Sequence, residues 1–252
     1  MSAETTVGPN WHVDVEGCVN FRDAGGWELD DGRRMRSRHL YRSDDPVRLT
    51  ARGRNAVRSL GIGFVVDLRQ RAQAARGAGF LPIEQTARIP LVDRVIDPDA
   101  PPSLLSPIDL ADLYDEMLDR SRQSIADVLD HVAAHVAAGP VLVHCAYGKD
   151  RAGLVTALVQ SAIGVPAESI VVDYARSHEP STRRRAWMLR EPLPGDPDLS
   201  MMPGLLFSAP PTSMRMLLDR MVERHGSLDE WPSSLPIKPD TVARLRDGLV
   251  ER

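Results

Sequence analysis

Short apolar runs that alternate with helical patterns are the feature that most constrains the fold of this chain. Residues 64–68 form one brief β-branched run of the buried-strand type, and residues 141–143 form another. The strongly apolar helical pattern 152–163 follows the second run and stops at Gly164. Strands that alternate with helices predict an α/β fold in which helices flank a central, mostly parallel sheet.

Two further helices have clear sequence signals. Thr50 is typical of an N-cap for a helix that runs to Leu60, and Gly61 would end it in the left-handed conformation. A second helix is indicated by apolar residues that recur on one face and by the Gly-Pro pair after it. The apolar residues of that face are Ile125, Val128, Leu129, Val132 and Val136.

Irregular segments separate these elements. Residues 87–91 predict another strand that runs into 92–93, and the Pro-, Asp- and Ser-rich residues 94–107 predict a loop. From residue 165 onward the pattern is helical, with an interruption at 192–211 that is rich in Pro and Gly. Residues 178–211 are therefore a candidate lid segment.

Composition narrows the class of protein. The 252 residues are expected to form one domain, 1–252, with 42% hydrophobic and 26% charged residues. The net charge of −4 gives no general attraction to nucleic acid or to an anionic membrane. The first residues lack a secretory signal pattern, and no apolar run is long enough to span a bilayer. We therefore expect a cytoplasmic protein without stable membrane insertion.

The most informative segment joins the strand at 141–143 to the helix that follows it. Cys145 lies where the buried strand ends, and Arg151 lies where the apolar helix begins. The five residues between them must form a tight loop whose N–H groups, with the helix N-terminus behind them, can hold an anion. Gly148 allows close approach of the backbone, and the planar guanidinium of Arg151 matches phosphate oxygens.

The same donors act on the cysteine. A helix N-terminus and a nearby cation favour the thiolate, which is the nucleophilic form. A thiolate at the centre of an oxyanion pocket suits phosphoryl transfer through a phosphocysteine that water then hydrolyses. The alternative is that Cys145 is a small core residue, but His144 and the charged run 149–151 are out of place in a sealed core. Cys18 has no comparable neighbours and is expected to be structural.

These residues resemble a known family, the bacterial atypical tyrosine and dual-specificity phosphatases. The resemblance covers nearly the whole chain, and its signature is His-Cys-x-x-Gly-Lys-Asp-Arg-x-Gly at residues 144–153. Five further matching segments are residues 20–26, 40–43, 67–69, 173–177 and 226–228. The resemblance implies a phosphotyrosine phosphatase-like fold, often with a helical lid, and a catalytic reaction without metal or organic cofactor.

The resemblance also implies roles for the loop residues. Cys145 would be the nucleophile and Arg151 the phosphate clamp, and residues 146–150 would line the phosphate site. The individual lining residues would be Ala146, Tyr147, Gly148, Lys149 and Ala152. Lys149 is notable because this chain otherwise uses arginine almost throughout, with Lys238 the only other lysine. A compact charge at this position would suit a second phosphate of the substrate.

Three aspartates compete for the role of general acid, which protonates the leaving oxygen. Asp67 matches the position that the family assigns to this role and is favoured. Asp150 lies inside the loop itself, and Asp93 resembles the aspartate of a movable acid loop. The sequence leaves all three open.

Other assignments also stay open. Arg22 and Asp23 are either a structural ion pair beside the loop or a further phosphate contact. Ala152 replaces the hydroxyl residue that the family carries after the arginine, which predicts slow breakdown of the phosphocysteine. The substrate is expected to be a phosphorylated protein, on tyrosine or also serine and threonine, or a phosphoinositide. The alternatives are a phosphate-binding pseudophosphatase with little turnover and, fitting less well, a sulfurtransferase.

Two charged groups have simpler interpretations. His131 and His135 are four residues apart but are expected on the solvated face of their helix, so we predict no metal site there. The run 183–185 of three arginines also suggests a solvated helix face, or a surface that steers phosphorylated substrates if it belongs to a lid.

Overall fold

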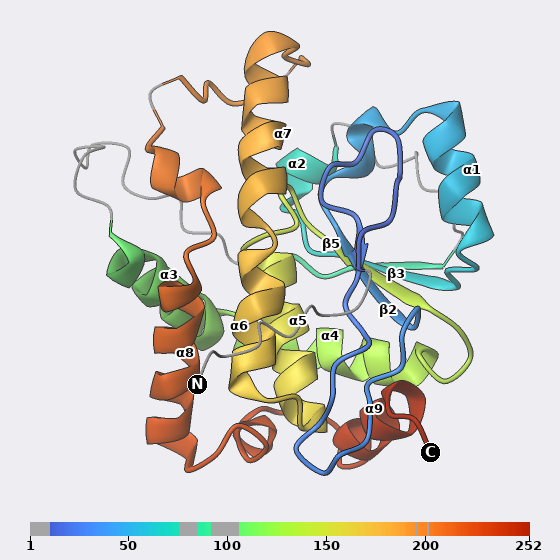
Figure 1. The fold of residues 1–252 in the computed structure, drawn as a ribbon, viewed down its shortest axis with the longest axis vertical. Helices are drawn as coiled ribbons and strands as arrows, with labels where there is room; N and C mark the ends of the chain where they lie inside the picture. Colours follow the sequence, from blue (N-terminus) through green and yellow to red (C-terminus); the bar gives the residue numbers. More distant parts are fainter. Residues whose placement is uncertain (1–10, 76–84, 92–105, 195, 201) are drawn as a thin grey trace, which may run out of the picture.

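A five-stranded sheet organises the computed structural model, which describes residues 11–75, 85–91, 106–194, 196–200 and 202–252. The strand order is β1-β2-β5-β3-β4, and only β1 is antiparallel to its neighbour. The prediction of a mostly parallel sheet flanked by helices is confirmed (Figure 1). The strands are β1 (Arg22–Asp23), β2 (Leu40–Ser43), β3 (Phe64–Asp67), β4 (Thr86–Arg88) and β5 (Val141–His144).

Helices occupy both sides of this sheet (Figure 1). In that view α1 lies at the right with the strands, and α3 and α8 lie at the left. The α-helices are α1 (Ala51–Ser59), α2 (Arg71–Ala74), α3 (Pro107–Arg120), α4 (Arg122–His135), α5 (Arg151–Ile163), α6 (Ala167–Ala175), α7 (His178–Arg190), α8 (Pro211–His225) and α9 (Thr241–Leu249). Short 3-10 helices are η1 (Pro46–Arg48), η3 (Gly204–Phe207) and η4 (Trp231–Ser234).

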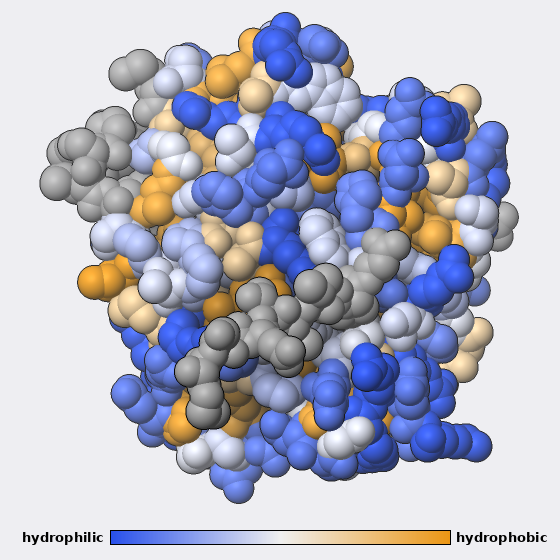
Figure 2. Space-filling view, in the orientation of Figure 1, coloured by the Kyte–Doolittle hydropathy of each residue, from blue (hydrophilic) through white to orange (hydrophobic). Residues whose placement is uncertain are grey.

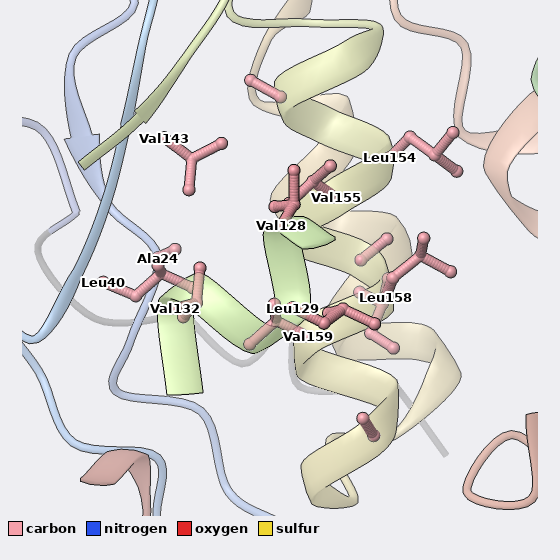
Figure 3. Close-up of a cluster of buried hydrophobic side chains, with 14 of the residues drawn as sticks. Ala24, Leu40, Val128, Leu129, Val132, Val143, Leu154, Val155, Leu158 and Val159 are labelled. Carbon is pink, nitrogen blue, oxygen red and sulfur yellow. The ribbon is translucent and has the colours of Figure 1, made fainter. Parts of the chain in front are cut away.

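Alternation along the strands sorts the core into two parts. Because successive side chains point to opposite faces, Leu40 and Val143 meet one set of helices while Tyr41 and Leu142 meet another. The first face packs against α4 and α5, as the labelled side chains of Figure 3 show. The second face packs against α1 and the segments beside it, with Val57 fully buried between them.

The carboxyl ends of the parallel strands lie at one edge of the sheet. Ser43, His144 and Asp67 occupy the same row of the ladder across β2, β5 and β3. The residues that follow them in the chain therefore lie beside one another, which is where α/β proteins of this kind place their ligand sites. The loop from Cys145 to Asp150 begins at this row.

Most helix signals are confirmed. The Thr50 hydroxyl accepts a hydrogen bond from the Gly53 N–H at 3.1 Å, and α1 ends before Gly61, whose φ is +67°. Gly164 ends α5 with φ +94°, as the pattern predicts. The helical face from Ile125 to Val132 is buried in α4.

Two boundaries differ from the prediction. Strand β4 spans Thr86–Arg88 and stops before Pro90, which has no N–H to donate to a sheet ladder. The predicted loop 94–107 lies outside the described residues as far as 105, and α3 already begins at Pro107. Ser106 and Asp109 form a capping box there, a helix-start signal inside the segment that was predicted as loop.

The two histidines of α4 also differ from the prediction. His131 and His135 are half-buried, and the His135 ring stacks on Phe64 with 3.6 Å between ring centroids. The aromatic ring of Phe64 covers the face that was expected to be solvated.

Charged and polar residues dominate the face of the molecule shown in Figure 2, where hydrophobic residues are scattered rather than gathered. Among the described residues, the exposed large hydrophobic side chains are Ile108, Val172, Leu189 and Val222. The described part of the chain contains no helix that is long and apolar enough to cross a membrane.

Candidate active site

Cys145 is the first residue after β5, and its side chain is buried at the base of a tight loop. The Gly148 N–H donates to Cys145 Sγ over 3.2 Å. Gly148 has φ +66°, and a Cβ there would lie 2.7 Å from both the Asp44 nitrogen and the Ser43 oxygen. Only glycine lets the loop turn back on the sulfur while touching the backbone that follows β2.

Arg42 holds the second half of the loop from outside. Its Nη2 donates to the Gly148 carbonyl at 2.7 Å and to the Lys149 carbonyl at 3.2 Å. Its Nη1 pairs with Asp173 at 2.6 Å, and both side chains are fully buried. The close approach requires Gly153 in α5, because a Cβ at that residue would lie 2.6 Å from Arg42 Nη2.

The first half of the loop is held in the same manner. The Ala146 carbonyl accepts from the Asp45 N–H at 3.2 Å, and the Tyr147 carbonyl accepts from Asn20 Nδ2 at 2.8 Å. Four consecutive carbonyls, 146–149, are thus bonded to the scaffold. Because the C=O and the following N–H of a peptide point in opposite directions, the N–H groups of 147–150 are directed to the other side, where Gly148 reaches the sulfur. The loop forms an anion cradle of inward N–H groups at a helix N-terminus.

Arg151 is the first residue of α5 and is buried. Its Nη1 donates to the Leu68 carbonyl at 3.2 Å and to Gln73 Oε1 at 2.9 Å. These contacts place the guanidinium at the β3–α2 side of the loop. Gln73 also lines the cavity described below, so Arg151 is connected to that cavity through a direct partner.

Asp67 is a buried carboxylate, and Arg69 donates hydrogen bonds to both of its oxygens. Arg69 donates to Oδ1 from its backbone N–H at 3.0 Å and from Nε at 2.9 Å, and to Oδ2 from Nη2 at 2.9 Å. Burial raises the pKa of Asp67, but the hydrogen bonds and charge of Arg69 outweigh it and hold that pKa below its usual value. Asp67 is therefore held ionised, and its oxygens are directed to a structural partner.

Asp150 has a different environment. Its side chain is 25% exposed, and its Oδ1 accepts from the Tyr114 hydroxyl at 2.8 Å and faces Lys149 Nζ at 3.0 Å. Asp150 also occupies the N-cap position of α5. Asp93, the third candidate acid, lies outside the described residues.

The ammonium group of Lys149 is turned toward the cover of the loop. Nζ donates to the Leu206 carbonyl at 2.7 Å and to the Ser208 carbonyl at 2.8 Å, in addition to its contact with Asp150. The side chain is buried. In this state Lys149 joins the loop to η3 rather than facing the space above the cradle.

Arg22 lies beneath the site in a fully buried ion-pair network. It donates to the Asp173 carbonyl at 3.0 Å and to Ser177 Oγ at 2.8 Å, and it also contacts Asn20. Arg22 therefore pairs with Asp173 and not with Asp23, whose carboxylate accepts from the Gly25 and Arg38 N–H groups. Ala152 is fully buried in the first turn of α5.

The segment 178–211 consists of α7, an irregular stretch and η3, which together cover the loop. Tyr147 of the loop packs edge-to-face on Phe207 with 5.5 Å between ring centroids. Met188 and Leu199 complete this small apolar cluster.

The arginine run 183–185 on α7 is not the solvated face that we expected. Arg184 is buried and pairs with Asp44 at 2.5 Å. Arg185 donates to the Leu199 and Met202 carbonyls. Only Arg183 is exposed. The difference arises because two of these guanidinium groups have partners inside the protein. Arg184 pairs with Asp44, which follows β2, and Arg185 bonds to carbonyls of the cover.

A cavity of about 60 Å³ lies between the loop and this cover. Its lining combines apolar surface with both signs of charge. The described lining residues are Asp45, Val47, Arg48, Gln73, Ala146, Tyr147, Arg184, Met188, Leu193, Pro194, Asp196 and Pro197.

Four residues that sequence reasoning gave no role support the loop. Asn20, Arg42 and Asp173 lie in the segments that carry the family resemblance, so their positions were marked although their contacts were not. Tyr114 had no such signal, since one tyrosine in an amphipathic helix is typical of a core residue.

Comparison with known proteins identifies the family of this chain. The profile of the Tyrosine phosphatase family matches residues 13–251. Triple specificity protein phosphatase PtpB of Mycobacterium tuberculosis is 35% identical over 203 residues, which cover 69% of this chain and 71% of PtpB. A putative tyrosine-protein phosphatase of Cupriavidus necator is 29% identical, covering 64% of this chain and 60% of its own.

A structural comparison adds one neighbour, TpbA of P. aeruginosa, crystallised in complex with pTyr. The match covers 84% of this chain and 97% of TpbA, at 19% identity and a TM-score of 0.36. The assignment rests on the sequence matches, which span the strand-loop-helix cradle, its supporting arginines and the helices behind them. By that extent of similarity the chain belongs to the tyrosine phosphatase family and is a phosphatase hydrolase.

Proposed function

We propose that this phosphatase hydrolyses phosphate monoesters by double displacement at Cys145. The observation that carries the proposal is the arrangement of the loop: its carbonyls are bonded to the scaffold, and the Gly148 N–H donates to the sulfur. Such a cradle stabilises the negative charge of a thiolate and, when a phosphoryl group is bound, the negative charge of its oxygens.

In the first step the Cys145 thiolate attacks phosphorus. An S–P bond forms, the bond from phosphorus to the leaving oxygen breaks, and a carboxylic acid transfers its proton to that oxygen. The inward N–H groups and Arg151 stabilise the three remaining phosphoryl oxygens. In the second step water attacks phosphorus, the carboxylate takes a proton from the water, and inorganic phosphate and the thiolate are released.

Asp150 suits the acid role better than Asp67. A general acid must carry a proton and reach the leaving group, whereas Asp67 is buried and held ionised by Arg69. Asp150 is partly exposed and lies within the loop that would hold the phosphate. We expect Asp150→Asn to slow release of poor leaving groups by about 10²-fold or more, while Asp67→Asn acts through stability.

The lining of the cavity supports one substrate class. Tyr147, Met188 and Val47 offer apolar surface for an aromatic ring, and the guanidinium groups of Arg48 and Arg184 lie beside it, each paired with an aspartate. These features support phosphotyrosine in a protein as the substrate, with phosphoserine or phosphothreonine and phosphoinositides as the alternatives. The names of the relatives, tyrosine-protein phosphatase and triple specificity phosphatase, point the same way.

The direct test is turnover of an aryl phosphate without added metal. We expect Cys145→Ser to lower turnover by about 10⁴-fold or more, since the nucleophile is removed, and vanadate to inhibit the native enzyme. A panel of phosphotyrosine, phosphoserine and phosphoinositide substrates then ranks the classes. Turnover that survives Cys145→Ser would contradict the proposal.

One sequence feature favours a second candidate, the pseudophosphatase with little turnover. Ala152 lacks the hydroxyl that the family carries after the arginine, and that hydroxyl would assist departure of the thiolate from the phosphocysteine. We predict that Ala152→Thr raises turnover at saturating substrate while leaving the initial burst of product intact. The measurement is the burst-to-steady-state ratio in stopped flow. Tight phosphate binding by the native protein without any burst would instead favour the pseudophosphatase.

The arrangement also bears on the organisation of the chain. We propose that 1–252 works as one phosphatase domain, with 178–211 as its lid. The family match over residues 13–251 supports this. The cytoplasmic location expected from the sequence stays a prediction, which cell fractionation checks.

A further inference from the structure

Two buried tyrosines from different helices form a hydrogen-bonded chain that ends on Asp150. Tyr114 of α3 donates its hydroxyl to Asp150 Oδ1 at 2.8 Å, and the hydroxyls of Tyr114 and Tyr174 are 2.6 Å apart. The two rings pack edge-to-face with 5.8 Å between centroids. Both side chains are essentially inaccessible to solvent, at 0% and 1% exposure.

The direction of the chain follows from its donors and acceptors. A phenol has one hydrogen to donate, and an ionised Asp150 oxygen can only accept it, so Tyr114 gives its hydrogen to Asp150 Oδ1 and keeps this direction in the acid form when the carboxyl proton is on the other oxygen. Tyr174 must then donate to the Tyr114 oxygen. Burial, reinforced by the charge of Asp150, raises the pKa of both tyrosines well above the usual value, so both remain donors at working pH.

Stability alone gives no reason for these hydroxyl groups. Burying a phenol oxygen is unfavourable unless it is hydrogen-bonded, and phenylalanine would fill the same apolar space without that requirement. The hydroxyls satisfy one another and Asp150, the only carboxylate inside the loop. Their combined effect is to fix the rotamer of Asp150.

The contacts of Asp150 are also asymmetric. Both polar contacts that the described residues make with its carboxylate, from Tyr114 and from Lys149, end on Oδ1. A carboxyl group that is protonated on Oδ2 keeps Oδ1 as an acceptor. The Tyr114 hydrogen bond is therefore compatible with the acid form only when the transferable proton sits on Oδ2.

We propose that Tyr114 is a positioning residue that fixes Asp150 as the general acid and selects Oδ2 as the oxygen that carries the proton, with Tyr174 holding Tyr114 in place. This rests on the function proposed above. In the first step the Oδ2–H bond breaks as the leaving oxygen takes the proton, and Asp150 becomes a carboxylate. In the second step Oδ2 regains a proton from the attacking water, so the network returns to its starting state.

The place of Tyr174 in the sequence, next to Asp173, strengthens the assignment. Its neighbour Asp173 pairs with Arg42, which holds the Gly148 and Lys149 carbonyls. Two adjacent residues of α6 thus support both functions of the loop. Asp173 supports the backbone cradle, and Tyr174 supports the acid.

The test compares leaving groups in Tyr114→Phe, which removes only the hydroxyl. An alkyl phosphate or phosphoserine peptide needs a proton on its leaving oxygen, whereas p-nitrophenyl phosphate depends on it little. We expect kcat to fall by about 10-fold on the alkyl ester and by less than about 3-fold on the nitrophenyl ester. Tyr174→Phe should show the same pattern more weakly. Tyr41→Phe, a buried tyrosine in the other part of the core, is the matched control and should leave both rates unchanged.

Two further measurements separate positioning from loss of structure. The alkaline limb of the pH–rate profile should flatten in Asp150→Asn, and adding Tyr114→Phe to that variant should cause no further loss. Equal loss on both esters in Tyr114→Phe would overturn the assignment, and so would additive losses in the double variant. The proposed function is tested separately, by the loss of turnover in Cys145→Ser. Neither of the two results above depends on that variant.

Discussion

The scaffold below the phosphate loop and the cover above it are built by different means. Below, two buried arginines, Arg42 and Arg22, share the carboxylate of Asp173, and no water reaches any of the three side chains to an appreciable extent. Above, one buried ion pair, Arg184 with Asp44, anchors α7, and the rest of the cover is attached by carbonyl groups and single side chains. The Lys149 ammonium and Arg48 provide two of these attachments.

This difference indicates which parts of the enzyme are rigid and which are held less firmly. A buried arginine that loses its carboxylate leaves an uncompensated charge, so the scaffold can change only at a large energetic penalty. A carbonyl released from the cover can bond to water instead. The cradle is therefore preorganised, whereas the part of the cover beyond the Arg184 anchor is held by contacts that can exchange with water.

Removing Arg42 should have the largest effect. Arg42→Ala leaves Asp173 with Arg22 alone and leaves two buried loop carbonyls without their donor, at about 1–3 kcal/mol each, so we expect a loss of about 3–5 kcal/mol in the free energy of unfolding. Urea denaturation measures it. Arg33→Ala, which breaks an exposed pair with Asp31, is the control and should change stability little. Similar small losses in both variants would show that the scaffold is not the rigid part.

Gly148→Ala should come next. The new Cβ would lie 2.7 Å from three backbone atoms at a residue with φ +66°, so we expect about 2–4 kcal/mol of destabilisation and loss of activity. Gly61→Ala is a close match, with φ +67° and nothing within 4 Å of the new Cβ. It should show only the conformational penalty of about 1–2 kcal/mol. If the two variants were equal, contact with the backbone after β2 would not be what demands glycine.

Sequence reasoning reached the sheet and the loop because both depend on local signals. The apolar runs that became β3 and β5, and the glycine that ends α5, act over a few residues. The loop geometry follows from a strand that runs directly into a helix, so the cradle at Cys145 was within reach of the sequence.

Most of the parts that sequence reasoning did not reach are long-range. Tyr114 and Asp150 are 36 residues apart, and Arg42 and Asp173 are 131 apart. Likewise Arg184 reads as a surface residue until Asp44, 140 residues earlier, gives it a buried partner. One miss is local: Arg69 lies two residues from Asp67, but the sequence does not show that it donates to both oxygens of that carboxylate.

The cover should respond to Arg48→Ala more in dynamics than in stability. Arg48 lies over the Trp187 ring at 4.7 Å and contacts Glu191 and Asp196. We expect about 1 kcal/mol of lost stability and faster hydrogen exchange in residues 191–200. Arg52→Ala, an exposed arginine on α1, should change none of these. Exchange that stayed slow would mean that the cover is held elsewhere.

The smallest expected effect is on acid stability. Burial lowers the pKa of His144, and the Arg69 contacts lower the pKa of Asp67 in spite of its burial. Both groups therefore bind fewer protons in the folded state than in the unfolded state. Stability should be flat above about pH 6.5 and fall below it as unfolded histidine protonates, then fall further below about pH 4 through Asp67.

Urea midpoints measured between pH 7.5 and pH 5 test the histidine part of this slope. His144→Gln should flatten it, and His225→Gln, a half-buried histidine at the end of α8, should not. An unchanged slope in His144→Gln would assign the acid sensitivity to other groups.

The most direct test of covalent catalysis at Cys145 is a rapid-quench experiment that looks for phosphate bound to the enzyme. An aryl phosphate is mixed with the native protein, the reaction is stopped in acid within one turnover, and the digested peptides are examined by mass spectrometry. The account predicts a phosphoryl group on the sulfur of Cys145 in the native protein and in Asp150→Asn, and none in Cys145→Ser. Full turnover with phosphate on another residue, or with no covalent adduct at any time, would contradict it.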